Sequence, residues 1–248
     1  MRNICSLLLI LFIAGQCMAQ QKEEKAKPAF SSSGAVKWNP ESLYFGKVGL
    51  SGEYNFKHKK SVTFGMGIPF NKALTYKLDN QDRSISMKTF SVMGGYRMYM
   101  GKKFMRGIYF EPYLKYLKND ASIIINADLN GRPVDFVTTS SYSGFGAGLQ
   151  LGVQFMIAKR IVFDFFFLGP EANSVHHQAA MHDITSTSPW NAADAADAQQ
   201  QINANIGDVP IIGKKLKVTV DANARTVSSD YKGFLPGFRA GLSAGVRF

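Results

Sequence analysis

Segments of about ten residues, in which apolar residues alternate with small or polar ones, recur along this chain and constrain its fold more than any other feature. Residues 237–248, for example, read GFRAGLSAGVRF, with one parity apolar and the other built from Gly, Ser and Arg. A period of two places successive side chains on opposite faces of a β-strand. Each segment therefore predicts a strand with one apolar face and one polar face.

The alternation predicts eight strands, which cover residues 35–39, 43–56, 61–70, 89–100, 108–116, 145–157, 161–168 and 237–248. The connections after the second, fourth and sixth strands are short and basic, whereas those after the third, fifth and seventh are long and cover residues 71–87, 119–140 and 170–231. In an up-and-down barrel, successive connections alternate between the two ends. One end would then have short turns and the other long loops. After residue 20 no run of about 18 apolar residues predicts a transmembrane helix.

A secreted β-sandwich would also contain alternating strands. Two features favour a transmembrane barrel. Aromatic residues gather at the strand ends, as in the girdles of such barrels: Phe70, Phe90, Phe145 and Phe234 toward the loops, and Phe56, Phe155, Phe163 and Phe248 toward the turns. The opposite faces are rich in Gly and charge, which suits the filled interior of a narrow barrel. We predict an all-β fold, an antiparallel up-and-down transmembrane β-barrel of eight strands with short periplasmic turns and long extracellular loops.

The first residues predict export. Arg2 precedes the apolar run 4–14, and small residues follow at 17–19, which together are typical of a cleaved signal peptide over residues 1–19. A flexible periplasmic segment, 20–33, and a barrel domain, 34–248, would follow. Cys17 raises the alternative of a lipid-modified N-terminus, although Gln16 stands where such sites carry a small residue. Both cysteines lie in the removed peptide, so the mature chain would have no disulfide.

The formal charge of +11 would suit a nucleic-acid partner. The basic residues instead occur in the short connections 57–60, 102–106 and 159–160, and an exported protein seldom meets nucleic acid. We therefore predict no nucleic-acid partner and expect the basic turns to face anionic lipid headgroups.

The stretches AVKWNP, GLSGEYNF, GGYRMYM, GIYFEPYLKY and AGLSAGVRF resemble strands of a domain-of-unknown-function family of small Gram-negative outer-membrane β-barrels, distantly similar to the OmpA and OmpX transmembrane domains. The resemblance covers most of residues 33–170 and 232–248. It implies an outer-membrane location and a barrel fold, with no shared catalytic activity. It also implies an assembly signal in the last strand, which the barrel assembly machinery reads, at Phe238, Leu242, Val246 and Phe248. We expect no counterpart of the peptidoglycan-binding domain found in full-length OmpA.

Charged residues on the polar faces predict a cluster inside the barrel. With a turn centred near Phe104, Arg97 and Glu111 face each other across a hairpin. Glu53 and Asp164 lie at a similar height above their own turns. We predict a charge-paired layer near the periplasmic end, made by Glu53, Arg97, Glu111, Asp164, Arg239 and Arg247. The interior of an eight-stranded barrel is just wide enough for side chains to fill, which favours a structural plug over an ion-selective ring.

Three histidines, His176, His177 and His182, occur in the segment predicted as the longest loop. Imidazoles can bind zinc or copper, but this spacing matches no helix-borne motif. Asp183 beside His182 could orient it as a general base, yet no serine stands in a nucleophile-elbow context. The sequence therefore predicts no metal site and no catalytic residue.

The sequence GFGAGL at 144–149 lacks the spacing of a dinucleotide-binding loop, and no helix follows it. Because its glycines share one parity, we expect them to pack against bulky lumen residues such as Tyr109 and Tyr113. No cofactor is predicted.

The long connections carry secondary structure of their own. Residues 191–206 are rich in Ala and Gln and predict a helix, and Asn130-Gly131 predicts a hairpin over 121–139. Residues 215–229 predict a second strand pair. These protruding elements would either bind a partner by strand addition or stiffen the loops.

Together these features predict a monomeric outer-membrane barrel with a structural or surface-interaction role. Its expected partners are outer-membrane lipids and lipopolysaccharide, the assembly machinery during insertion, and a possible extracellular ligand or protein at the loops. A small-solute channel is the alternative if unpaired lumen charges leave a continuous water path. A membrane-embedded enzyme would require a His and an acidic residue to converge at the loop end.

Overall fold

The computed structural model describes residues 32–78, 81–101, 103–206 and 215–248. The strands are β1 (Ser33–Asn39), β2 (Lys47–Lys57), β3 (Lys60–Pro69), β4 (Lys72–Leu78), β5 (Gln81–Tyr99), β6 (Gly107–Leu129), β7 (Arg132–Ile157), β8 (Ile161–Leu168), β9 (Pro170–Asp183), β10 (Leu216–Asp221), β11 (Thr226–Phe238) and β12 (Gly241–Arg247). A 3-10 helix, η1 (Pro40–Phe45), follows β1, and an α-helix, α2 (Ala192–Ile206), precedes β10. Among these residues no helix is both long and apolar enough to cross a bilayer.

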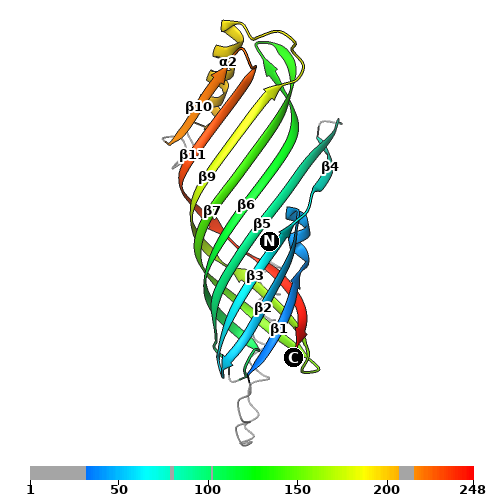
Figure 1. The fold of residues 1–248 in the computed structure, drawn as a ribbon, viewed down its shortest axis with the longest axis vertical. Coiled ribbons are helices and arrows are strands. Elements are labelled where there is room, and N and C mark those ends of the chain that lie inside the picture. The colour runs from blue at the N-terminus through cyan, green and yellow to red at the C-terminus, as the bar shows by residue number, and fades with distance from the viewer. Residues whose placement is uncertain (1–31, 79–80, 102, 207–214) are drawn as a thin grey trace, which may run out of the picture. The chain divides into compact units, whose positions relative to one another are not determined.

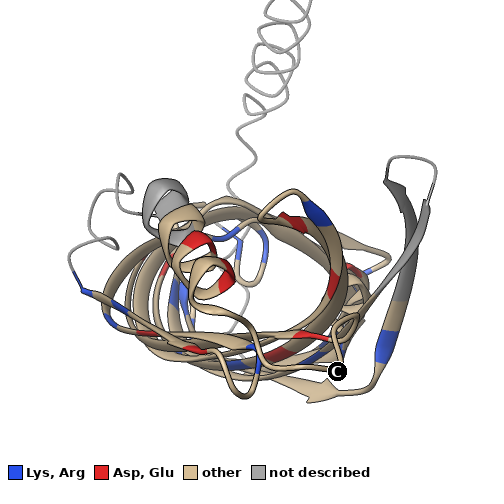
Figure 2. Ribbon diagram, turned by 90° about the horizontal axis from the view of Figure 1, so that it is seen from above, with Lys and Arg blue, Asp and Glu red and all other residues tan. Residues whose placement is uncertain are grey.

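Eight of the strands close into an antiparallel ring in the order β1-β2-β3-β5-β6-β7-β8-β12 (Figures 1 and 2). The first and last strands pair directly, with Val36 opposite Val246. Backbone hydrogen bonds of 3.0 and 2.9 Å between Gly34 and Phe248 extend this pairing by one position. The predicted eight-stranded up-and-down barrel is confirmed.

One side of the ring continues upward as a taller curved sheet (Figure 1). Strands β5, β6 and β7 are long, and β8 and β12 are prolonged by β9 and β11 after short interruptions at residues 169 and 239–240. The sheet extends from β4, which pairs with β5, to β10, which pairs with β11. The prediction of long loops over 71–87, 119–140 and 170–231 is therefore wrong in large part, because paired strands occupy much of these ranges.

The inner and outer faces of the tall sheet exchange their polarity with height. For this reason the strand extensions were not predicted. In its lower part β6 directs Leu114 outward, 67% exposed, and Glu111 inward, fully buried. Near its upper end it directs Asp128 outward and buries Leu129 on the inner face. The lower pattern suits a wall surrounded by lipid, and the upper pattern suits a sheet in water around an apolar interior. Outward-facing apolar residues therefore mark only the lower part of these strands.

Aromatic residues mark the height at which the polarity changes. Tyr116, Phe145 and Phe234 occupy the same outward-facing row, linked by strand register through Ser174. In the next outward row above them the register brings together Lys118, Ser143, His176 and Lys232. The apolar outer band therefore ends at this aromatic row.

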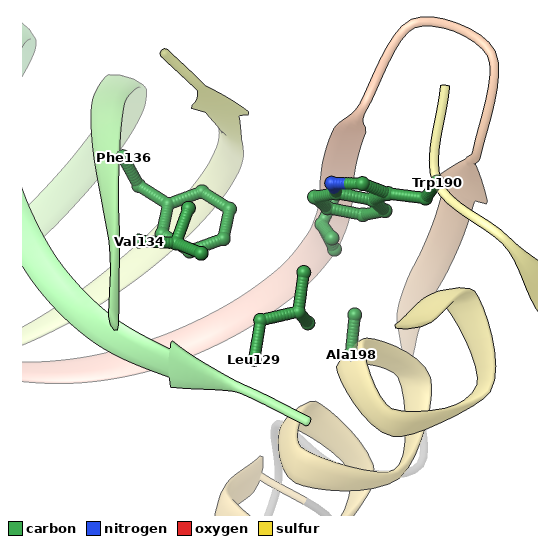
Figure 3. Close-up of a cluster of buried hydrophobic side chains, with 6 residues drawn as sticks. Leu129, Val134, Phe136, Trp190 and Ala198 are labelled. Carbon is green, nitrogen blue, oxygen red and sulfur yellow. The ribbon is translucent and has the colours of Figure 1, made fainter. Parts of the chain in front are cut away.

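An apolar cluster fills the upper end of the tall sheet (Figure 3). It consists of Leu129, Val134, Phe136, Trp190, Ala198 and Val227. Ala198 lies on α2, and seen from above this helix lies over one side of the ring (Figure 2). The side-chain oxygen of Asn191 accepts a 2.9 Å hydrogen bond from the Asp194 backbone N–H and so caps the helix. The predicted helix over 191–206 and both predicted hairpins are confirmed.

Asp183 ties the segment before α2 to this apolar cluster. Its carboxylate accepts hydrogen bonds from the indole N–H of Trp190 at 2.8 Å and from the backbone N–H groups of Thr185 and Ser186 at 2.8 and 3.0 Å. Burial alone would raise the pKa of this carboxyl, but the hydrogen bonds outweigh it and hold the pKa below the ordinary value of 3.8.

The predictions for the N-terminal part of the chain can be compared with the structure only in part. The predicted signal peptide 1–19 and residues 20–31 lie outside the described residues. Strand β1 starts at Ser33, one residue before the predicted domain boundary. The predicted strand over 43–56 starts only at Lys47, because Pro40 begins η1 and Gly46 ends it with a φ of +64°.

Candidate functional site

The lower end of the barrel interior is closed by an apolar layer, which we call the floor. It consists of Ala35, Tyr99, Phe104, Met105, Tyr109, Met156 and Val162. Met105 lies in the turn between β5 and β6, has a φ of +52° and is completely buried. Because a turn residue is buried among lumen side chains, the floor fills the turn end of the barrel.

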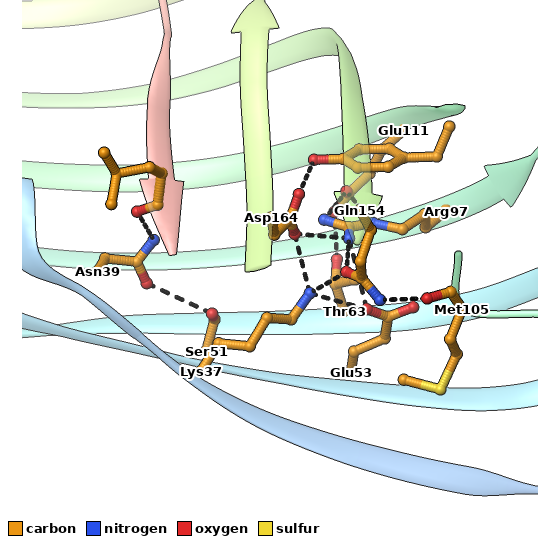
Figure 4. A network of polar contacts seen from close by, with 12 residues as sticks. Lys37, Asn39, Ser51, Glu53, Thr63, Arg97, Met105, Glu111, Gln154 and Asp164 are labelled. Atoms are coloured by element: carbon orange, nitrogen blue, oxygen red, sulfur yellow. Dashed lines mark hydrogen bonds and ion pairs between the residues drawn. The ribbon is translucent and has the colours of Figure 1, made fainter. Parts of the chain in front are cut away.

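Above the floor lies a layer of buried charges contributed by five strands, which we call the charge layer (Figure 4). It contains Lys37 from β1, Glu53 from β2, Arg97 from β5, Glu111 from β6 and Asp164 from β8. All five residues are less than 5% exposed. Buried charges are stable only when opposite charges and hydrogen bonds compensate their lost hydration.

Arg97 lies at the centre of the charge layer. Its guanidinium lies 2.7 Å from carboxylate oxygens of both Glu111 and Asp164 and 3.4 Å from Glu53. It also lies over the ring of Tyr109, with Cζ 3.7 Å from the ring centroid. One guanidinium therefore bridges carboxylates from three strands.

Lys37 provides the second cation of the charge layer. Its ammonium donates to Glu53 at 2.8 Å, to Asp164 at 2.9 Å and to the side-chain oxygen of Gln154 at 2.7 Å. Gln154 accepts a further hydrogen bond from Arg97 at 2.8 Å. Glu53 and Asp164 are thus each held by both cations.

Neutral donors complete the charge layer, in which two cations face three carboxylates. Tyr99 donates to Glu53 and Tyr109 donates to Asp164, both at 2.6 Å. Glu111 accepts hydrogen bonds from Thr63 and, at 3.0 Å, from the amide of Gln150. These donors stabilise the excess negative charge.

The structure brings together four of the six residues predicted for the lumen cluster, namely Glu53, Arg97, Glu111 and Asp164. Lys37 is a fifth member of the charge layer that was not predicted from the sequence. Its segment is short, but the residue has the inward parity, since its neighbours Val36 and Trp38 are outward and exposed. That parity was the available signal.

Arg239 and Arg247 do not join the charge layer. Arg239 donates to Gln150 at 2.9 Å and lies over the ring of Phe166 at 4.4 Å. Arg247 donates to Ser33 at 3.0 Å and stacks over Phe104 of the floor at 4.8 Å. The prediction that both belong to one paired layer is wrong, because they point to heights above and below it.

The inward glycines provide the space for large lumen side chains. A Cβ at Gly148 would collide with the ring of Tyr113, and one at Gly152 would collide with Tyr109. Tyr109 is thereby placed against the charge layer. For the glycines of 144–149, the expected packing against a lumen tyrosine is confirmed at Gly148, whereas a Cβ at Gly144 would first meet Val175 and one at Gly146 would meet Asn173.

The histidines of β9 do not converge on one site. His176 faces outward and lies 2.6 Å from Asp230, whereas His177 faces inward and lies 2.9 Å from the hydroxyl of Ser140. His182 contacts Thr226, while Asp183 points to the opposite face. His182 and Asp183 therefore form no dyad. Within the described ranges no three metal-binding side chains of the His, Cys, Asp or Glu type gather.

The four residues predicted as an assembly signal share the outer face of β11 and β12. Phe238, Leu242, Val246 and Phe248 are 62, 41, 56 and 78% exposed. The structure thus places them on the apolar outer band, whereas Arg239, Ser243 and Arg247 alternate with them on the lumen side.

Comparison with known proteins places the chain in a family. Residues 5–207 match the sequence profile described as "Outer membrane protein beta-barrel domain". The solved structures that resemble it include the crystal structure of Acinetobacter baumannii CarO, at 10% identity and a TM-score of 0.42, covering 90% of this chain and 100% of that chain. The comparison with curated proteins gave no match.

Proposed function

Since this chain belongs to the outer membrane protein beta-barrel domain family and lies in the outer membrane, we propose that it is a non-conducting barrel that displays its tall sheet and α2 at the cell surface. Its role would be structural or one of surface interaction, without enzymatic activity. The apolar outer band would contact outer-membrane lipid, and the tall sheet would stand above the bilayer.

The charge layer is the observation that carries this proposal. Its side chains come from five strands and meet across the lumen, with oxygen to nitrogen distances of 2.7 to 2.9 Å at four ion pairs. The floor lies directly below. A hydrated ion would have to separate several buried ion pairs in order to pass, and each separation leaves an uncompensated charge.

Single-channel recording tests the proposal. The purified barrel, shown to be folded by its heat-modifiable gel mobility, is inserted into planar bilayers. The wild type should give no conductance steps, whereas a folded variant that opens both layers, with Lys37, Glu53 and Arg97 replaced by Ser and Met105 and Tyr109 of the floor replaced by Gly, should conduct. Reproducible steps from the wild type would contradict the proposal and favour the channel alternative.

The enzymatic alternative finds no support in the arrangement of the histidines. The pair Ser140 and His177 is within hydrogen-bond distance, but among the described residues no carboxylate contacts His177 to orient it as a base. Interaction through the upper part of the molecule is the alternative that remains, and we propose that an extracellular ligand or protein would bind to the tall sheet and α2. Recognition of the last strand by the assembly machinery is likewise part of the proposal.

A further inference from the structure

A cavity of about 300 Å³ lies in the lumen above the charge layer. Three basic and two acidic side chains line it: Lys47, Lys115, Arg239, Glu41 and Glu171. Small residues leave the space open, among them Gly49, Ser51, Gly65, Gly67 and Ser91. The volume is at the lower end of the range for small-molecule sites.

Two of the basic side chains have no acidic partner. Lys115 forms an ion pair with Glu171. The ammonium of Lys47, in contrast, donates to the hydroxyl of Ser91 at 3.0 Å. The guanidinium of Arg239 contacts Gln150 and the sulfur of Met93. Among the described residues no carboxylate lies within 4.0 Å of Lys47 or Arg239. Both cations are therefore available to pair with an anionic group of a ligand.

An acidic side chain in the same lining is incompletely satisfied. Glu41 lies on η1, and its Oε1 accepts a long hydrogen bond of 3.5 Å from Asn39. Its Oε2 is buried and has no hydrogen-bond partner in the part of the chain that the structure describes. A buried carboxylate oxygen without a donor is costly, and a ligand that supplies an N–H group would remove that cost.

We propose that this cavity binds a small zwitterion, with its carboxylate at Lys47 and Arg239 and its ammonium group at Glu41. Because Lys115 and Glu171 pair with each other, Lys47 and Arg239 remain for one ligand carboxylate and Glu41 remains for one ligand ammonium group. A simple anion would leave the Oε2 of Glu41 without a donor, and a dianion would be repelled by it. Charge-assisted hydrogen bonds at both ends would select a molecule that carries both groups.

Equilibrium dialysis of the folded, detergent-solubilised protein tests this assignment. The radiolabelled probes are glycine, β-alanine and γ-aminobutyrate, which differ in the spacing of the two charges, with propionate and ethylammonium as single-charge controls. At least one zwitterion should be retained saturably. Each single-charge control should bind about tenfold more weakly, as expected for the loss of a charge-assisted hydrogen bond.

The variants Lys47→Gln and Glu41→Gln should each weaken binding of that zwitterion by about tenfold. The matched control Lys88→Gln removes a charge from an exposed position on β5 and should leave binding unchanged. Heat-modifiable gel mobility verifies folding of every variant. Binding is measured without reference to conductance, so failure here is distinguishable from failure of the proposed non-conducting role.

Three results would overturn the proposal. These are the absence of saturable retention of all three zwitterions by the wild type, unchanged binding by both folded cavity variants, and equal binding of propionate and the best zwitterion. The last result would show that Glu41 receives no ammonium group and that the cavity selects a simple anion.

Discussion

Replacement of Arg97 by Ala tests the energetics of the charge layer most directly. The substitution removes the cation that lies 2.7 Å from Glu111 and from Asp164 and leaves three buried carboxylates with Lys37 alone. Breaking a buried pair on one side costs about 3–5 kcal/mol. Two charge-assisted hydrogen bonds at about 1.5–3 kcal/mol each give a similar range. We expect a loss of about 4 kcal/mol in the free energy of unfolding.

The assay is urea unfolding of the barrel in lipid vesicles, followed by the gel mobility difference between folded and unfolded forms. Arg160→Ala is the matched control, because Arg160 is exposed in the turn between β7 and β8. Its effect should stay within about 0.5 kcal/mol. Arg97→Lys retains the charge without the planar fork and should give an intermediate loss.

Equal unfolding free energies for Arg97→Ala and Arg160→Ala would refute this reasoning. They would mean that water enters the layer and hydrates the carboxylates, so that the ion pairs are not buried in practice. A double-mutant cycle with Glu111→Gln isolates the pair itself. A coupling below about 0.5 kcal/mol would contradict a direct buried interaction.

Three further predictions concern the last strand, the packing in the lumen and the segment before α2. Phe248→Ser should lower the amount of folded barrel in the outer membrane, measured in membrane fractions, and normal levels would count against an assembly role for that residue. Gly152→Ala should destabilise the barrel by about 1–3 kcal/mol in the urea assay, because the new methyl group would overlap both Tyr109 and the backbone oxygen of Phe165; an unchanged midpoint would show that the tyrosine and the neighbouring strand can both move aside. Asp183→Ala should cost about 1–3 kcal/mol and expose Trp190 to water, seen as a fluorescence red shift when the chain's other tryptophan is replaced by Phe. The folded pKa of this carboxyl lies below 3.8, so its contribution to the stability of the unmodified protein is present above pH 3.8 and is lost as the pH falls through the folded value. An emission maximum of Trp190 that is already shifted to the red at neutral pH in the unmodified protein would contradict the assignment.

The alternation of residue types allowed the lower barrel to be predicted, because a strand with lipid on one side and a filled lumen on the other must alternate with a period of two. The contact between Arg97 and Glu111 was also accessible, since a hairpin register is set by a turn between neighbouring segments. Above the aromatic row the same strands were not predicted. Their apolar side turns inward there, as Leu129 and Phe136 show.

Only the tertiary structure decided which residues meet across the lumen. Parity assigns Lys37, Arg239 and Arg247 to the inner face, but it does not give their heights. Those heights depend on the stagger of strands around the closed ring and on the length of each side chain. Lys37 therefore joined the charge layer, and Arg239 came to line the cavity above it. The sequence by itself determined the faces of each strand, whereas closure of the ring determined the partners.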